Sequence, residues 1–77
     1  MTIDEFKKNI APHMNKGYVA MDKDCTWCSY TKKPLKGKLI RSWLPDVEDD
    51  YIELTTLFNI KPVDDWTKSL IEVGEKQ

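Results

Sequence analysis

The chain has 77 residues, of which 40% are hydrophobic and 32% are charged. A chain of this length forms one small domain over residues 1–77 and buries roughly 60% of its unfolded surface, which leaves no room for a deep cofactor cleft. The net charge of -1 excludes both a strongly basic nucleic-acid binder and an acidic mimic of DNA.

The two halves of the chain carry opposite charge. Residues 1–38 contain eight Lys and four acidic residues, a net charge of +4, whereas residues 39–77 contain four basic and nine acidic residues, a net charge of -5. Such an imbalance fits attraction within the chain, a homodimer joined head to tail, or two faces that meet different partners.

The N-terminal segment lacks the apolar stretch of a signal peptide, and no run of about 18 apolar residues is present that would span a membrane. These absences predict a cytoplasmic protein with no membrane partner. In that compartment Cys25 and Cys28 are expected to be thiols and not a disulfide.

The first expected element is a helix over residues 3–10. Thr2 and Glu5 match a capping box, in which each side chain satisfies a free backbone N–H of the other. Phe6 lies on the apolar face that follows at helical spacing. Pro12 ends this helix or lies just beyond it.

A β-hairpin is expected over residues 18–31. Both ends of this stretch are rich in aromatic and β-branched residues, which favour strands. Between them, Asp22 and Asp24 favour a turn because their side chains bond to the nearby backbone. This is the central feature of the predicted fold.

Three further elements are expected after the hairpin. Residues 39–43 are a strand candidate, and at residues 51–58 β-branching favours a strand over a competing helix. A C-terminal helix is expected over residues 63–73, where Asp64 and Asp65 suit the first turn. Apolar residues then follow on one face: Val63, Trp66, Leu70 and Val73.

The pattern predicts an α+β fold, with a small antiparallel sheet of three to four strands, an N-terminal helix and a C-terminal helix. The expected core contains Phe6, Trp27, Trp43, Trp66 and Leu70. If both helices cover one face of the sheet, the other face stays partly exposed and forms a contact surface. Candidate binding residues are aromatic and charged residues of that surface: Tyr18, Tyr30, Lys32, Lys33, Asp49, Asp50 and Tyr51.

Residues 17–34 read GYVAMDKDCTWCSYTKKP. This stretch resembles a hairpin of small proteins encoded by tailed bacteriophages, in which Val-Ala-Met-Asp-x-Asp-Gly precedes Tyr-x-x-Lys-Pro. Residues 65–70, DWTKSL, are similar to the C-terminal segment of those proteins. Cys25 stands where they carry Gly. The resemblance implies a phage protein and carries over no active-site residue.

The Cys25-x-x-Cys28 spacing is half of a zinc site, because a structural zinc ion takes four ligands and His13 is the only histidine. A thioredoxin-like role needs the cysteines at a helix N-terminus, and here they fall in a hairpin. Neighbouring carboxylates would also raise the thiol pKa. We therefore expect two small hairpin side chains and no metal, with a metal-stabilised module as a third reading.

The sequence contains no other complete motif for a metal site or a catalytic site. Asp22 and Asp24 begin like a calcium loop, but Thr26 occupies the fifth position, where a ligand is required. His13 has no nucleophile pattern near it, and no phosphate-binding or dinucleotide motif occurs. The sequence therefore predicts no catalytic residue, no cofactor and no enzymatic activity.

The predicted function is that of a small non-enzymatic, phage-encoded protein that binds a host protein and modulates it, with inhibition as one form. The alternative is a small nucleic-acid-binding accessory protein. Lysines of the first half and the aromatic rings of Tyr18, Trp27 and Tyr30 would then form a stacking surface. Arg, the usual fork for phosphate and bases, occurs once, which makes nucleic acid the less favoured partner.

Overall fold

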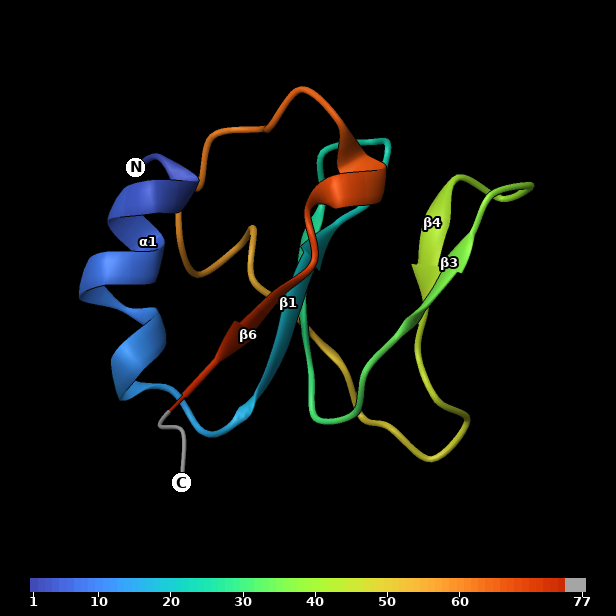
Figure 1. Ribbon diagram of the computed structural model, residues 1–77, viewed down its shortest axis with the longest axis horizontal. Helices are drawn as coiled ribbons and strands as arrows, with labels where there is room; N and C mark the ends of the chain where they lie inside the picture. The colour runs from blue at the N-terminus through green and yellow to red at the C-terminus, as the bar shows by residue number, and fades with distance from the viewer. Residues whose placement is uncertain (75–77) are drawn as a thin grey trace.

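A four-stranded antiparallel sheet forms the centre of the molecule, and the computed structural model describes residues 1–74 (Figure 1). Strands β1 (Gly17–Met21) and β2 (Trp27–Tyr30) make the expected hairpin. β5 (Ile52–Glu53) pairs with β2, and β6 (Ile71–Val73) pairs with β1. The strand order is therefore β5-β2-β1-β6, with every neighbouring pair antiparallel.

The N-terminal helix is confirmed as α1 (Ile3–Asn9), followed by a short 3-10 helix η1 (Ala11–His13). Its first turn is closed by the capping box: the backbone N–H of Glu5 donates to Thr2 Oγ1, and that of Thr2 donates to Glu5 Oε1. This reciprocal bonding satisfies two N–H groups that a helix start leaves free. Phe6 is the fully buried residue of the helix.

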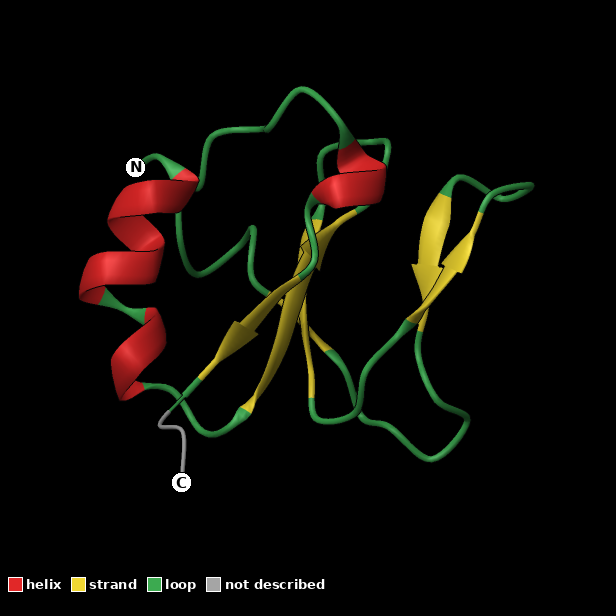
Figure 2. Ribbon diagram, in the orientation of Figure 1, coloured by secondary structure: helices red, strands yellow, loops and turns green. Residues whose placement is uncertain are grey.

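The two faces of the sheet are covered by different elements (Figure 2). On one face α1 places Phe6 in a core with Val19 and Trp27. The other face is covered by a separate hairpin of β3 (Leu35–Gly37) and β4 (Ser42–Leu44). From that hairpin, Trp43 joins a second core with side chains of the central strands: Ala20, Cys28 and Tyr30. The sheet is thus the middle layer of three.

The prediction of a C-terminal helix over residues 63–73 is wrong. Asp65 caps only one 3-10 turn, η2 (Trp66–Lys68), after which the chain extends into β6. Ser69 Oγ accepts a hydrogen bond from the backbone N–H of Met21 (2.8 Å) and fixes this change of direction. The β-branched residues of β6 suit a strand better than a helix, and pairing with β1 gives them their partners.

Two of the expected strands also differ from the structure. Residues 39–43 do not form one strand, because residues 38–41 make the turn between β3 and β4. Within residues 51–58 only β5 is extended, and the chain then turns, with the backbone N–H of Leu57 donating to the carbonyl of Leu54 (2.9 Å). The α+β class is confirmed, with one N-terminal helix and sheets of four and two strands.

Among residues 1–74, the helices are too short and too polar to cross a membrane.

Candidate functional site

The hairpin of β3 and β4, residues 35–44, extends beside the sheet, and we call it the arm (Figure 1). Its turn, residues 38–41, ends at Arg41, whose φ of 56° lies in the left-handed region that only glycine adopts without steric cost. The Arg41 carbonyl accepts a hydrogen bond from the backbone N–H of Lys23 (3.1 Å) in the β1–β2 turn. The body of the protein therefore helps to hold the arm's turn in this conformation.

Trp43 fastens the arm to the sheet. Its backbone N–H donates to Asp22 Oδ1 (2.7 Å), and its indole N–H is shared between the carbonyls of Met21 (3.1 Å) and Trp66 (3.3 Å). Its ring meets that of Trp66 edge to face, with centroids 6.2 Å apart. These contacts bury Trp43 and fix which face of the arm points outward.

The strand alternation of the arm sends two leucines to its outer face. Leu35 lies opposite Leu44, and Lys36 lies opposite Trp43. Because successive side chains point to opposite faces of a strand, the burial of Trp43 against the body directs Leu35 and Leu44 away from it. Leu35 is accordingly 72% exposed.

The turn adds two more apolar side chains. Leu39 at the tip is 99% exposed, and Ile40 is also exposed. Ile40 and Leu44 lie over Gly37, where an added Cβ would be 3.0 Å from Ile40 Cγ1 and 3.1 Å from Leu44 Cγ. We call these four exposed side chains the outer patch: Leu35, Leu39, Ile40 and Leu44.

A groove of about 420 Å³ separates the arm from the segment around η2. We call it the basic groove, because three lysines line it together with apolar side chains and no acidic residue. Its lining residues are Lys33, Pro34, Leu35, Lys36, Trp43, Thr67, Lys68 and Leu70. The arm thus joins an apolar outer face to a positively charged recess.

The three tyrosines predicted as binding residues have different surroundings. Tyr30 is buried beneath the arm, so its place on an exposed contact surface is a wrong expectation; Trp43 covers the sheet face that was expected to stay open. Tyr51 is exposed and packs against Tyr30 with ring centroids 5.9 Å apart. Tyr18 is half-buried and lines a pocket of about 190 Å³ with Lys16 and other residues.

Of the charged candidates, Lys33 lines the basic groove. Lys32 forms an exposed ion pair with Glu48 (3.6 Å). Asp49 anchors the loop after β2: its carboxylate accepts hydrogen bonds from the Thr31 hydroxyl (2.6 Å) and from two backbone N–H groups, and these bonds lower its pKa. Asp50 is exposed. The structure therefore does not bring the seven candidates into one surface.

The two cysteines occupy unlike positions. Cys25 is exposed in the β1–β2 turn, and Cys28 is buried on β2 beneath the arm. Burial raises the pKa of the Cys28 thiol to about 11, with nearby Asp22 as a further cause, so this thiol is protonated at neutral pH. Such a thiol is a poor nucleophile and a poor metal ligand.

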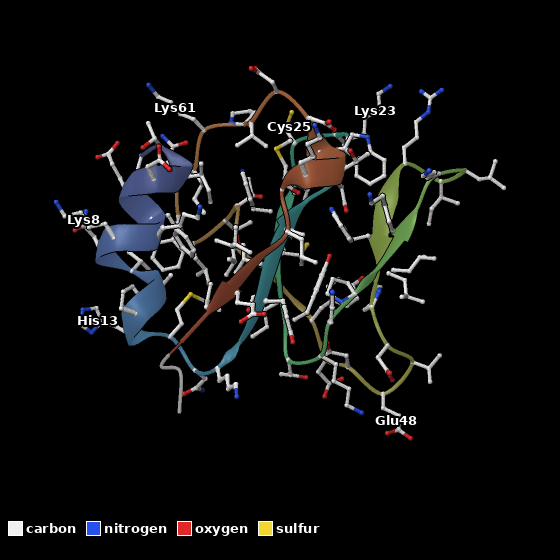
Figure 3. The ribbon with its side chains drawn as sticks, in the orientation of Figure 1. Lys8, His13, Lys23, Cys25, Glu48 and Lys61 are labelled. Atoms are coloured by element: carbon white, nitrogen blue, oxygen red, sulfur yellow. The ribbon has the colours of Figure 1, made fainter. Side chains whose placement is uncertain are left out.

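His13 and Cys25 lie at different ends of the molecule (Figure 3). Within residues 1–74, no three His, Cys, Asp or Glu side chains lie close enough together to hold a metal ion. The arm is the part of the described chain in which exposed apolar residues, cations and a recess coincide.

Sequence reasoning missed the outer patch. The pattern of residues 39–43 predicts a strand that contains Leu39 and Ile40, and nothing local in an apolar pair indicates that a turn exposes it. One signal was present: residues 32–44 contain five Lys and Arg and no acidic residue, with leucines spaced among them. A segment of that kind is atypical of a buried strand.

No family model, no curated protein and no solved structure matches the chain.

Proposed function

We propose that this chain is a non-enzymatic, phage-encoded protein that binds a protein of the bacterial host through the arm and modulates it, with inhibition as one form. The outer patch carries this proposal. Leu39 and its neighbours are exposed on an arm that Trp43 holds in place. Burial of apolar surface by a partner is favourable by roughly 25 cal/mol per Å², so a fixed apolar patch is suited to binding protein.

Three further observations support the proposal. The hairpin at residues 17–34 resembles that of small phage proteins. His13 and the thiol of Cys25 lie apart and do not form a nucleophile and base pair (Figure 3). The second thiol, Cys28, is buried and protonated at neutral pH. A reaction needs several groups that converge in one pocket.

A small nucleic-acid-binding accessory protein is the second candidate, and the basic charge of residues 32–44 favours it. Proteins that bind single strands combine such charge with aromatic side chains on which bases stack. Trp27 and Tyr30 are buried and Tyr18 is half-buried, so these rings do not form an open platform. The apolar side chains of the outer patch cannot bind phosphates, whereas a protein partner can bury them. The outer patch therefore favours a protein partner.

The test places a photo-crosslinker on the arm. In the variant Leu39→p-benzoylphenylalanine, irradiation in bacterial lysate is expected to give one discrete protein adduct. The matched control puts the same group at Lys8, which is exposed on α1 far from the arm (Figure 3). Adding Ile40→Asp to the Leu39 variant is expected to abolish the adduct, because a buried carboxylate is costly at an apolar interface.

Equal labelling from both positions, or no adduct from Leu39, contradicts the proposal. Thermal unfolding of each variant checks that the fold is intact. Leu39 is fully exposed, so its replacement removes no contact of the folded chain.

A further inference from the structure

The positive charge of the basic groove favours acidic ligands over basic ones. Lys33 and Lys36 lie on the side of the arm, and Lys68 lies on the side of η2. The carboxylate of Asp65, next to η2, has a pKa that is lowered mainly by hydrogen bonds from Thr67 and further by the charges of Lys68 and Lys36. A carboxylate placed at this groove is therefore stabilised by the lysines that line it.

β3, from which Leu35 and Lys36 line the groove, has a free edge in the two-stranded sheet. The backbone N–H of Trp43 donates to Asp22 and so points away from β3. Lys36, which lies opposite Trp43, is then in a pair that is not hydrogen-bonded across the hairpin, because such pairs alternate in an antiparallel ladder. Its own N–H and C=O therefore point outward, at the free edge of β3.

The same charge argues against a second copy of this chain at that edge. Pairing two arms edge to edge would bring two Lys36 residues and their neighbouring cations together, and residues 32–44 hold no carboxylate to compensate. Like charges placed opposite each other across strands are destabilising. An acidic partner meets no such repulsion.

We propose that the basic groove binds an extended, acidic segment of the partner protein, which adds as a strand to the free edge of β3. Main-chain hydrogen bonds to Lys36 give this segment its alignment, as in other cases of strand addition. Its carboxylates meet Lys33, Lys36 and Lys68, and its alternate, apolar side chains lie on the opposite face of the arm, beside Leu35. The proposal rests on the proposed function and names the chemistry of the partner.

The probe is a synthetic peptide of about seven residues in which Glu alternates with Val, since alternation sends carboxylates to one face of a strand. Its binding to the full chain is measured by calorimetry and by NMR. The first comparison peptide alternates Lys with Val, and the second keeps the acidic composition with a central Pro, which cannot add to a ladder. We expect the acidic peptide to bind about ten-fold more tightly than either comparison peptide, because only it matches the charge and edge of the groove.

A pair of variants tests the backbone contact. Lys36→Pro removes the outward N–H together with the lysine side chain, whereas Lys36→Ala removes the lysine side chain and keeps the N–H. Proline is tolerated on an edge strand when its missing N–H faces solvent, so the arm is expected to keep its fold. We expect Lys36→Pro to bind the acidic peptide about ten-fold more weakly than Lys36→Ala, as loss of a main-chain bond requires.

A charge-reversal variant tests the groove without introducing a proline that could disturb the fold. Lys68→Glu reverses one charge of the groove and is expected to weaken peptide binding, whereas Lys8→Glu on α1 leaves it unchanged. Equal binding of the acidic and basic peptides, or no binding of either, overturns the proposal. Displacement of the acidic peptide by a single-stranded oligonucleotide that binds more tightly also overturns it, and assigns the groove to nucleic acid.

The two proposals fail in different experiments. If the Leu39 crosslinker captures a host protein while the peptides show no preference for acidic charge, the groove proposal alone is wrong. If the acidic peptide binds as expected but Leu39 captures no protein, the proposed function is wrong and the preference of the groove stands.

Discussion

Cys25 occupies a backbone conformation that favours glycine. Its φ is 72°, within a turn closed by the backbone N–H of Cys25 donating to the carbonyl of Asp22 (2.9 Å). Thr26 N–H donates to Asp24 Oδ1 (3.0 Å), so the turn is held on both sides of the cysteine. A side chain in this left-handed conformation costs roughly 1–2 kcal/mol, which glycine avoids.

Cys25→Gly is expected to stabilise the protein, by up to about 1 kcal/mol, because relief of the strain outweighs the entropy that glycine adds to the unfolded chain. Urea denaturation measures the change in the free energy of unfolding. Cys25→Val is the matched control and is expected to destabilise, since a β-branched residue tolerates positive φ least. A lower midpoint for the glycine variant would show that the Cys25 side chain contributes contacts of its own.

At the scale of elements, the segments predicted correctly are those whose signals are local. The capping box of Thr2 and Glu5 defines α1, and the turn residues Asp22 and Asp24 define the β1–β2 hairpin. The end of the chain is different. Residues 63–73 have a helical spacing of apolar residues, yet Ser69 and β6 are fixed by β1, which is about fifty residues earlier in the sequence. Pairing of that kind is invisible to a local pattern.

The candidate site divides in the same way. The charge of Lys33 makes it a candidate in the sequence, and the structure places it in the lining of the basic groove. The sequence predicts an exposed Tyr30, because no pattern in it indicates that Trp43 covers this side chain. The outer patch depends on which side of the arm Trp43 turns toward the body. That choice follows from tertiary contacts with Asp22 and Trp66, which the sequence does not display.

The arm's attachment can be tested through Asp22, whose carboxylate accepts the Trp43 backbone N–H. Burial raises the pKa of Asp22, while this hydrogen bond opposes that shift. Asp22→Ala is expected to speed amide hydrogen exchange in β3 and β4 about ten-fold, because loss of one such bond costs about 1 kcal/mol or more. Exchange in β1 and β2 is expected to change less.

Asp22→Asn is the control for that experiment, since an amide oxygen still accepts the Trp43 N–H. It is expected to leave exchange in the arm close to that of the unchanged protein. Equal acceleration in the arm and in the central hairpin would mean that the arm does not open separately from the sheet.

For the whole molecule, the three-layer arrangement decides where charge is displayed. The sheet lies in the middle, α1 covers one face and the arm covers the other (Figure 1). Five cations without a carboxylate are concentrated in residues 32–44, and an acidic loop that contains Asp46, Glu48 and Asp50 follows directly. The cationic region is therefore short and bounded, which suits a segment of protein better than a long polyanion.

We expect no complex with single- or double-stranded DNA or RNA tighter than about 10 μM at physiological salt, a limit well above the range of specific complexes. Titration with labelled oligonucleotides at increasing salt measures this. A tighter complex that weakens steeply with salt, and that is lost when Lys32, Lys33, Lys36 and Lys38 become Ala, would make nucleic acid the first candidate.

The pairing of β6 with β1 also sets an order for folding. The β1–β2 hairpin closes over a short turn, whereas contact between Ser69 and Met21 must close a long loop, at a larger cost in chain entropy. Elements joined by local contacts form first in such chains, and distant strands dock afterwards. We expect the central hairpin to act as the nucleus and β6 to complete the sheet after the transition state. Substitutions around Ser69 would accordingly act on the rate of unfolding, while those in the hairpin would act on the rate of folding.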